Sequence, residues 1–445
     1  MQHLVIIGNG ITGVTTARHV RKHSDMKITI ISGESKYFFS RTALMYVYMG
    51  HMKWDNIKPY EDWFWKKNKI DLIYAHVSSI NIENKTLLLD NGQTIEYDKL
   101  VIATGSSTNK FGWPGQDLPG VQGLYSKQDL ELLEENTKTI KEAIIVGGGL
   151  IGIELAEMLH TRGIHVTFLV RENLYWGNIL PPEESAVVSR HILEHSFDLK
   201  LGTQLREILP CNNGRVKAII TDKDEVINCQ FVGLTPGVRP NIELVKNTKI
   251  ETGRGILVNE YLETNISGIY SAGDCAEIKS NAEGEKNRVE QLWYAGRMQG
   301  EVLAQNILGK KIKYDRGIWF NSAKFLDIEY QTYGFVSNVL PRKGEETFYW
   351  EHPGKKKCFR VVYSSNDRSV KGFNVLGIRL RHQVCERWIK ENKPIEYVLE
   401  NLAEANFDPE FYDKHEEEII NKFNRENFGM NVSLNKQTNH SKQLA

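Results

Sequence analysis

The chain has 445 residues, 41% of them hydrophobic, and its 56 basic and 56 acidic side chains give a formal net charge of zero. This length suffices for about two to four domains, and the balanced charge argues against a nucleic-acid-binding protein. No apolar run approaches the ~18 residues of a membrane-spanning helix, and a strand pattern begins near residue 4. We therefore expect a cytoplasmic protein without an integral membrane segment or a signal peptide.

The first glycine-rich motif lies close to the N-terminus. Gly8, Gly10 and Gly13 form a G-x-G-x-x-G pattern between an apolar run at residues 4–7 and a helical pattern. In a strand–turn–helix, the first glycine permits a sharp turn, the second lets the backbone approach a pyrophosphate, and the third lets helix and strand pack closely. The free N–H groups at the start of the helix then favour the anion. The motif predicts a dinucleotide site.

Later segments fit the same site. Glu34 follows the second predicted strand, where an acidic side chain can accept hydrogen bonds from a ribose, although a solvated loop glutamate is the alternative. A buried strand ends in the small residues Thr104 and Gly105, which let a loop lie against a ligand. The Gly273-Asp274 pair offers a carboxylate to a sugar hydroxyl, although such a pair is more often a turn.

A second G-x-G-x-x-G motif consists of Gly147, Gly149 and Gly152, again between a strand pattern and a helical pattern. Sites for NAD usually carry an acid at the end of the next strand, where this chain has Val170 followed by Arg171. An arginine can pair with a 2′-phosphate, so this position favours NADPH, unless Arg171 is only a solvated charge. Two such motifs imply two dinucleotides and electron transfer between them.

The cysteines and histidines show no ligand pattern. The five cysteines, at positions 211, 229, 275, 358 and 385, include no C-x-x-C pair or tight cluster. The thirteen histidines show no H-E-x-x-H motif or similar spacing. We therefore expect reduced thiols and no metal site.

The C-terminal part has a different composition. Aromatic residues become frequent from about residue 314, and alternating patterns at 358–363 and 370–378 predict an antiparallel sheet. Helical patterns follow at 382–391 and 396–405. The aromatics are most simply a core, with a partner-binding surface as the alternative.

Together these motifs resemble the FAD-dependent pyridine nucleotide–disulfide oxidoreductase superfamily, in its order and near its spacing over roughly residues 1–310. The resemblance implies an α/β fold of two Rossmann-like dinucleotide-binding domains with a C-terminal α+β interface domain. The expected parts are a discontinuous FAD-binding domain at 1–120 and 248–313, an inserted NAD(P)H-binding domain at 121–247, the C-terminal domain at 314–430, and a disordered tail at 431–445.

The resemblance also assigns residues. The expected FAD-binding residues are Gly8, Gly10, Gly13, Glu34, Arg41, Thr104, Gly105, Gly273 and Asp274. The expected NAD(P)H-binding residues are Gly147, Gly149, Gly152 and Arg171. Glu154 matches an acid near the nicotinamide, and Trp293, at the start of a helix that points toward the flavin, is a candidate wall of the flavin pocket. A core tryptophan is the equal alternative for Trp293.

The segment 40–46 separates branches of this superfamily. Disulfide-reducing members carry a redox cysteine pair near residues 40–50 or in the second domain, and peroxide-reducing relatives carry one cysteine near residue 42. This chain has no cysteine there. The segment resembles the thiol-free ferredoxin, rubredoxin and nitrite reductase branch, in which Tyr46 occupies the position of a common lysine. Tyr46 either covers the flavin ring or packs in the core.

The sequence therefore predicts an NAD(P)H oxidoreductase that passes electrons directly from FAD to a small electron-carrier protein. Two alternatives stay open: a peripheral NADH:quinone reductase, which needs an amphipathic C-terminal anchor, and a redox-sensing flavoprotein of the apoptosis-inducing-factor type. Homodimerisation also stays open.

Overall fold

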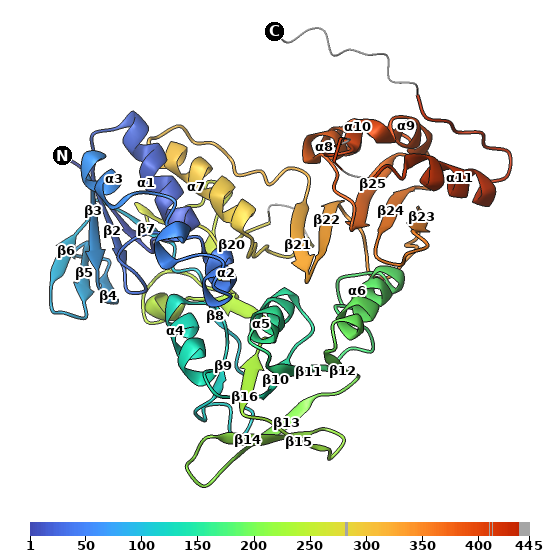
Figure 1. Ribbon diagram of the computed structural model, residues 1–445. Helices are drawn as coiled ribbons and strands as arrows, with labels where there is room; N and C mark the ends of the chain where they lie inside the picture. Colours follow the sequence, from blue (N-terminus) through green and yellow to red (C-terminus); the bar gives the residue numbers. More distant parts are fainter. Residues whose placement is uncertain (281–283, 409, 412, 436–445) are drawn as a thin grey trace. The chain divides into compact units, whose positions relative to one another are not determined.

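The computed structural model describes residues 1–280, 284–408, 410–411 and 413–435 (Figure 1). The chain divides into two compact units, which are described separately. Unit 1 comprises Met1–Gly147, Leu155–Val166 and Leu205–Arg316, and unit 2 comprises Gly148–Glu154, Thr167–Gln204 and Gly317–Ala445. Within the described ranges, no helix is both long enough and apolar enough to cross a membrane.

A five-stranded parallel sheet in unit 1 has the strand order β19-β7-β1-β2-β3. Its strands are β1 His3–Ile7, β2 Lys27–Ser32, β3 Ile70–Tyr74, β7 Lys99–Ile102 and β19 Ile269–Ser271. Although β19 is distant in sequence, its Ile269 lies opposite Leu100 of β7. Two segments of the chain thus build one sheet, which confirms the predicted discontinuous first domain.

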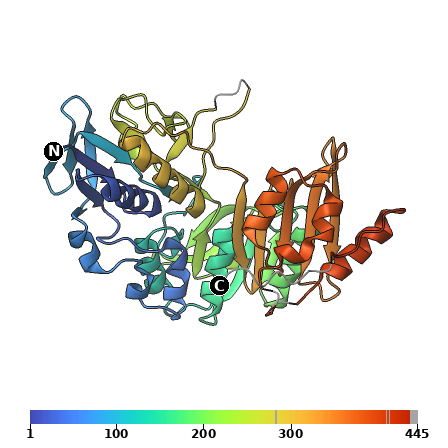
Figure 2. The same ribbon diagram turned by 90° about the horizontal axis from the view of Figure 1, so that it is seen from above.

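Two helices of unit 1, α1 Ile11–His23 and α7 Trp293–Ile307, lie side by side (Figures 1 and 2). Glycine permits this close approach, because a Cβ atom at Gly300 would lie only 2.8 Å from the carbonyl oxygen of Thr12. The central strand β1 is covered on both faces, and its Leu4 is fully buried. The packing of α7 against α1 sets the start of α7 near the first glycine motif.

Unit 1 also holds part of the second dinucleotide-binding region. There β10 Glu142–Val146 pairs in parallel with β16 Phe231–Leu234, and β16 pairs in parallel with β9 Val121–Gln122. The other elements of unit 1 that bear on the site are short. They are α2 Leu44–Tyr48, α3 Asp62–Lys67, α4 Lys127–Asn136, β8 Ser106–Thr108 with β17 Val238–Pro240, β18 Ile256–Val258 with β20 Ala276–Ile278, and the antiparallel sheets β4 Val77–Asn81, β5 Thr86–Leu89, β6 Thr94–Glu96 and β13 Leu205–Pro210, β14 Val216–Thr221, β15 Val226–Asn228.

Unit 2 contains the C-terminal sheet, which is antiparallel with the order β21-β22-β25-β24-β23. Its strands are β21 Phe320–Phe325, β22 Ile328–Gly334, β23 Glu345–Glu351, β24 Cys358–Ser364 and β25 Val370–Leu376. Four helices belong to the same α+β region: α8 His382–Lys390, α9 Ile395–Glu400, α10 Leu402–Ala405 and α11 Glu416–Glu426 (Figure 1). Phe348, Trp350 and Trp388 are buried in one core cluster, so these aromatics serve the fold.

The two units do not coincide with the predicted domains. Helix α6 Pro182–Glu194 and the parallel pair β11 His165–Val170 with β12 Asp198–Leu201 come from the predicted second domain, but residues 167–204 belong to unit 2. Two ion pairs connect α6 to the C-terminal sheet of this unit: Arg190 with Glu351 of β23, and Glu184 with Arg360 of β24. The predicted domain bounds therefore stay a prediction.

The predicted disordered tail, residues 431–445, begins with packed residues. Val432 is buried, its carbonyl oxygen accepts a hydrogen bond from Asn424, and Leu434 packs against the core cluster of unit 2. Residues 436–445 lie outside the described residues.

Candidate functional site

The first glycine motif has the geometry that a dinucleotide requires. Gly8 has a φ of +109°, and a Cβ atom on it would lie 2.1 Å from the carbonyl oxygen of Ala103. A Cβ atom on Gly13 would lie 2.1 Å from the carbonyl oxygen of Gly8. At Gly10, by contrast, a Cβ atom would meet no protein atom within 4 Å. The outer two glycines thus serve chain packing, and the middle one faces open space that a pyrophosphate can fill.

Helix α1 starts at this motif without a side-chain cap. Gly10 is its N-cap residue, and its first turn contains no acidic residue. Amide groups at such a helix start need acceptors, which an anion supplies. The amide nitrogen of the Asn9 side chain donates to the carbonyl oxygen of Ser35 at 2.8 Å, which ties the motif to the loop that carries Glu34.

Glu34 and Arg41 form a two-pronged ion pair. Arg41 donates from Nη1 to Glu34 Oε1 at 2.8 Å and from Nη2 to Oε2 at 2.6 Å. The backbone N–H of Lys127 also donates to Oε1 at 2.9 Å. The Glu34 carboxylate is therefore a held group and not a solvated loop charge. Because a carboxylate has about four acceptor positions, it retains capacity for a ribose hydroxyl.

Asp274 belongs to a hydrogen-bond network in the same unit. Ser106 Oγ donates to Asp274 Oδ2 at 2.9 Å, and Gln291 Nε2 donates to Ser106 Oγ at 2.8 Å. The Ser106 backbone N–H donates to the hydroxyl of Tyr125 at 2.9 Å. The Arg41 guanidinium lies over the Tyr125 ring, 4.3 Å from its centroid. These contacts bring together two predicted residues, Arg41 and Asp274, through side chains that come from separate segments.

Burial tunes the acids of this network. It raises the pKa of the Asp274 carboxyl above its usual value, against the opposing effects of the Ser106 hydrogen bond and of the Arg41 charge. Burial, followed by the negative charge of Asp274, raises the pKa of Tyr125 to about 12. Tyr125 thus remains a neutral phenol at ordinary pH.

The remaining predicted residues of this site have local contacts. Thr104 Oγ1 donates to the carbonyl oxygen of Asn241 at 2.6 Å, and the backbone N–H of Asn241 donates to the Gly105 carbonyl oxygen at 2.9 Å. Tyr46 stacks on His51 with ring centroids 6.2 Å apart. Trp293 is 36% exposed, as a wall of a ligand pocket or a surface residue can be, and it is not a core tryptophan.

A pocket opens beside Glu34. Its lining includes three lysines and three aromatic side chains. It is lined by Ser35, Lys36, Tyr37, Trp54, Lys58, Tyr74 and Lys127.

The second glycine motif repeats the geometry of the first. Gly147 has a φ of +125°, and a Cβ atom on it would lie 2.5 Å from the carbonyl oxygen of Thr235. A Cβ atom on Gly149 would meet nothing within 4 Å. Gly152 is buried in α5 Leu150–His160. Thr235 follows β16 as Ala103 follows β7, so the same strand–turn–helix occurs twice.

Within unit 2, Tyr175 holds the second motif. Its fully buried ring places the hydroxyl to donate to the Gly149 carbonyl oxygen at 3.1 Å. Burial, with a contribution from the negative charge of Glu154, raises the pKa of Tyr175. Arg171 is exposed and donates from Nη2 to Glu172 Oε1 at 2.7 Å. Glu172, an acid one position beyond Arg171, was not predicted as part of this site.

Sequence reasoning also missed Ser106, Tyr125 and Gln291. Two of them stood next to recognised signals: Ser106 directly follows Gly105, and Gln291 lies two residues before Trp293. Tyr125 precedes the capping box of α4, in which Ser126 and Asp129 bond each other's backbone N–H. That pattern predicts a helix start but no ligand contact.

The fold and the paired glycine motifs define an oxidoreductase with two dinucleotide sites. Residues 2–300 match the model of the pyridine nucleotide-disulphide oxidoreductase family. The chain is similar to an NADH oxidase of Methanocaldococcus jannaschii, with 30% identity over 84% of this chain and 87% of that protein. It is also similar to an NADH-rubredoxin oxidoreductase of Clostridium acetobutylicum, with 29% identity over 76% of this chain and 83% of that protein.

A solved structure shows the same fold. The NAD-dependent persulfide reductase of A. fulgidus superimposes with a TM-score of 0.83 at 22% identity, covering 96% of this chain and 84% of that one. The chain therefore belongs to the pyridine nucleotide-disulphide oxidoreductase family. It is an FAD-dependent NAD(P)H oxidoreductase, as the sequence predicted.

Proposed function

We propose that this enzyme passes electrons from NAD(P)H through FAD directly to a small redox protein, without a redox-active cysteine pair. The open space at Gly10 and at Gly149 carries the two-dinucleotide part of the proposal, because each middle glycine faces no protein atom. When bound, FAD supplies the chemistry that the side chains lack, accepting a hydride from NAD(P)H and releasing electrons to an acceptor.

The first site fits FAD. Gly8, Gly10 and Gly13 with the start of α1 would hold the pyrophosphate. Glu34, held by Arg41, would accept from the adenosine ribose, and Asp274 would accept from the ribityl chain. The remaining predicted contacts to the flavin are Thr104, Gly105, Gly273, Tyr46 and Trp293.

The second site fits NAD(P)H. Gly147, Gly149 and Gly152 would hold its pyrophosphate, and Glu154 would lie near the nicotinamide. We propose NADPH as the preferred nucleotide, since Arg171 offers a guanidinium at the strand end and no acid precedes it. The adjoining Glu172 accepts a hydrogen bond from that guanidinium and so competes with a 2′-phosphate for it. Arg171 and Glu172 together would therefore set the nucleotide preference.

The cysteines support direct transfer from the flavin. All five are free thiols, and four of them are buried. Burial raises the pKa of Cys229 to about 12 and raises those of Cys275 and Cys358 as well. A thiol relay needs an accessible thiolate, and these thiols are neither accessible nor acidic. Cys211, the more exposed one, lies just after β13, on a different segment from either glycine motif.

The names of two relatives support an acceptor class. The Clostridium acetobutylicum relative is named for rubredoxin, a small electron carrier, and a similar protein of Rhodococcus erythropolis is named rhodocoxin reductase. We therefore propose a small electron-carrier protein as the acceptor.

An anaerobic titration tests the proposal. The purified yellow protein should take up two electrons per FAD from dithionite, because only the flavin is reduced, whereas a cysteine pair would raise the uptake to four. NADPH and NADH should each reduce it, and rubredoxin or ferredoxin should then reoxidise it faster than a quinone does. A four-electron uptake, or full activity loss on alkylating Cys211 that a Cys211→Ser variant escapes, would contradict direct transfer.

A further inference from the structure

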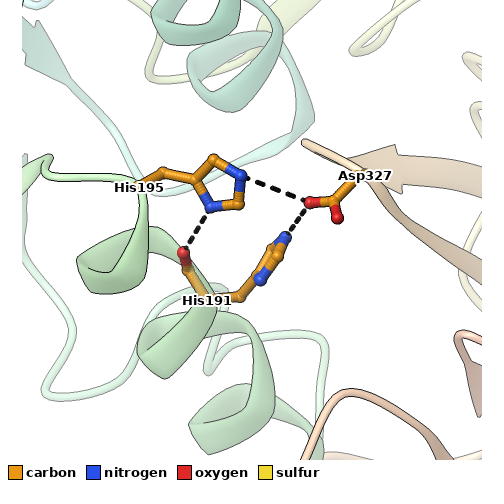
Figure 3. Close-up of side chains that lie close together, drawn as sticks. All are labelled: His191, His195 and Asp327. Carbon is orange, nitrogen blue, oxygen red and sulfur yellow. Dashed lines mark hydrogen bonds and ion pairs between the residues drawn. The ribbon is translucent and has the colours of Figure 1, made fainter.

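A cluster of metal-ligating side chains lies in unit 2, at residues to which the proposed function gives no role. His191 and His195 stand one turn apart at the C-terminal end of α6, and Asp327 occupies the turn between β21 and β22 (Figure 3). One ligand atom from each of the three residues lies within 4.8 Å of the other two. The two histidines form an H-x-x-x-H pair, whose i, i+4 spacing sets both imidazoles on one helix face.

The ligand atoms converge on one oxygen. His191 Nε2 bonds Asp327 Oδ1, and His195 Nε2 lies 3.4 Å from the same oxygen (Figure 3). Two ligand atoms at about 2.0–2.1 Å from a tetrahedral zinc ion lie roughly 3.4 Å apart. The His195–Asp327 separation already has this value, and the His191 side chain needs only a small outward shift.

The backbone fixes the tautomer of His195. Its Nδ1 lies 2.9 Å from the carbonyl oxygen of His191, which can only accept, so Nδ1 carries a proton. In a neutral ring Nε2 is then unprotonated, and its lone pair faces Asp327 Oδ1. Two such acceptors repel each other unless a positive charge lies between them. Either a proton on Nε2 or a bound cation supplies that charge, and the carbonyl contact is the outer-shell orientation that metal-bound histidines show.

His191 Nδ1 is buried and has no hydrogen-bond partner among the described residues. This nitrogen lies 3.7 Å from Glu194 Oε2, and that carboxylate also meets the Lys356 ammonium at 3.0 Å. His191 is 2% exposed, so the rest of unit 2 holds its ring, whereas Asp327 is 66% exposed. The cluster therefore has one rigid ligand and one side open to solvent.

We propose that His191, His195 and Asp327 bind a divalent first-row transition-metal ion, with Zn²⁺ as the representative. Two imidazoles and one carboxylate form a ligand set typical of such ions, and three protein ligands leave a position for water. The ion would join the end of α6 to the β21–β22 turn. None of the three residues is among those proposed to hold FAD or NAD(P)H, so the site is a different one from the two dinucleotide sites, although unit 2 also carries part of the second motif.

A second histidine cluster in unit 2 is less suited. His352, His415 and Glu418 also come within 4.8 Å of one another. There, however, the Lys357 ammonium lies 3.1 Å from His415 Nε2 and would repel a cation at that atom. No such ammonium contact is found at His195 Nε2 among the described residues, which favours the first cluster.

Calorimetric titration of the chelator-treated holoprotein with Zn²⁺ tests the proposal. One equivalent should bind with micromolar or tighter affinity, with proton release that is visible when two buffers of different ionisation enthalpy are compared. His195→Ala and Asp327→Asn, which change accessible side chains, should each weaken binding at least tenfold. His352→Ala is the matched control and should bind Zn²⁺ as the parent protein does.

Zn²⁺ should also raise the melting temperature of the parent protein but not that of His195→Ala. Unchanged binding in Asp327→Asn would show that Asp327 is not a ligand and would overturn the proposed site. Binding that is lost in His352→Ala and kept in His195→Ala would place the ion in the other cluster, and absence of binding to the parent protein would overturn it outright.

Discussion

Arg360 and Glu184 form a buried ion pair that joins β24 to α6 inside unit 2. Arg360 donates from Nε to Glu184 Oε1 at 2.6 Å and from Nη2 to Oε2 at 3.1 Å, and the two side chains are 2% and 0% exposed. Arg360 Nη1 also donates to Thr347 Oγ1 at 3.0 Å. In such a pair, either charge would be strongly destabilising if it stayed in the interior without its partner.

Removing one partner should therefore be far more damaging than replacing both. We expect Arg360→Ala to lower the free energy of unfolding by about 3–5 kcal/mol, because the Glu184 carboxylate then stays buried without its partner. The double variant Glu184→Leu with Arg360→Met should recover most of that loss. Urea unfolding followed by tryptophan fluorescence measures both.

Glu183 provides the matched control for this prediction. Its Oε2 lies 2.8 Å from Arg360 Nη2, but the Glu183 side chain is 51% exposed. Water screens such a pair, so Glu183→Gln should change the free energy of unfolding by less than about 1 kcal/mol. Equal losses for Glu183→Gln and Glu184→Gln would show that burial does not set the strength of this pair.

The glycine motifs predict separable effects on folding and binding. Gly10→Ala should fold normally, since the new methyl group meets no protein atom, but should weaken FAD binding at least tenfold. Gly13→Ala should instead destabilise the protein, because its Cβ would lie 2.1 Å from the Gly8 carbonyl oxygen. Flavin retention during dialysis and the thermal midpoint distinguish the two outcomes.

Gly149→Ala is the mirror variant in the second motif. It should keep its flavin and raise the KM for NADPH, because its Cβ also points into open space. If Gly149→Ala lost FAD while Gly10→Ala kept it, the second motif would be the FAD site and the first the NAD(P)H site.

The motif residues were predictable from sequence because each motif is local. The turn at Gly8, the close packing at Gly13 and the open position at Gly10 depend on a strand and a helix that adjoin in the chain. The Ser106–Asp274 and Ser106–Gln291 contacts were not predictable, because the partners lie 168 and 185 residues apart in the sequence and meet only in the folded chain. Motif matching finds the glycine turns, and it misses side-chain contacts between segments that are distant in the sequence.

The same limit applies to unit 2. Helix α6 carries an ordinary amphipathic pattern, and nothing local shows that its Glu184 meets Arg360 of a much later strand. The domain bounds predicted from motif order therefore take no account of these contacts, and they stay a prediction.

Asp274 should link flavin binding to pH-dependent stability. Burial raises the pKa of its carboxyl in the folded state above the unfolded value of about 3.9. The folded state therefore binds the Asp274 proton more tightly than the unfolded state does. The protonated carboxyl thus adds to the free energy of unfolding at low pH, and this gain is lost as pH rises through the folded-state pKa. Asp274→Asn cannot titrate, so flavin-stripped Asp274→Asn should gain stability relative to the flavin-stripped parent protein as pH rises from about 4 to 7.

The same variant should bind FAD about tenfold more weakly, because a neutral amide accepts a weaker hydrogen bond than a carboxylate. Urea unfolding of both stripped proteins across that pH range, with flavin titration at neutral pH, checks both effects. A stability difference that stays constant with pH would show that Asp274 does not titrate differently in the folded chain.

Arg171 and Glu172 should together set the choice of nucleotide. The Arg171 guanidinium donates to Glu172 Oε1, so a 2′-phosphate must draw it away from that carboxylate. Arg171→Ala should lower kcat/KM for NADPH about tenfold and leave that for NADH nearly unchanged. Glu172→Gln should shift the ratio the other way, because it frees the guanidinium and removes a charge that repels phosphate. Steady-state rates with both nucleotides measure this ratio, and an unchanged ratio in both variants would place the 2′-position of the nucleotide away from Arg171.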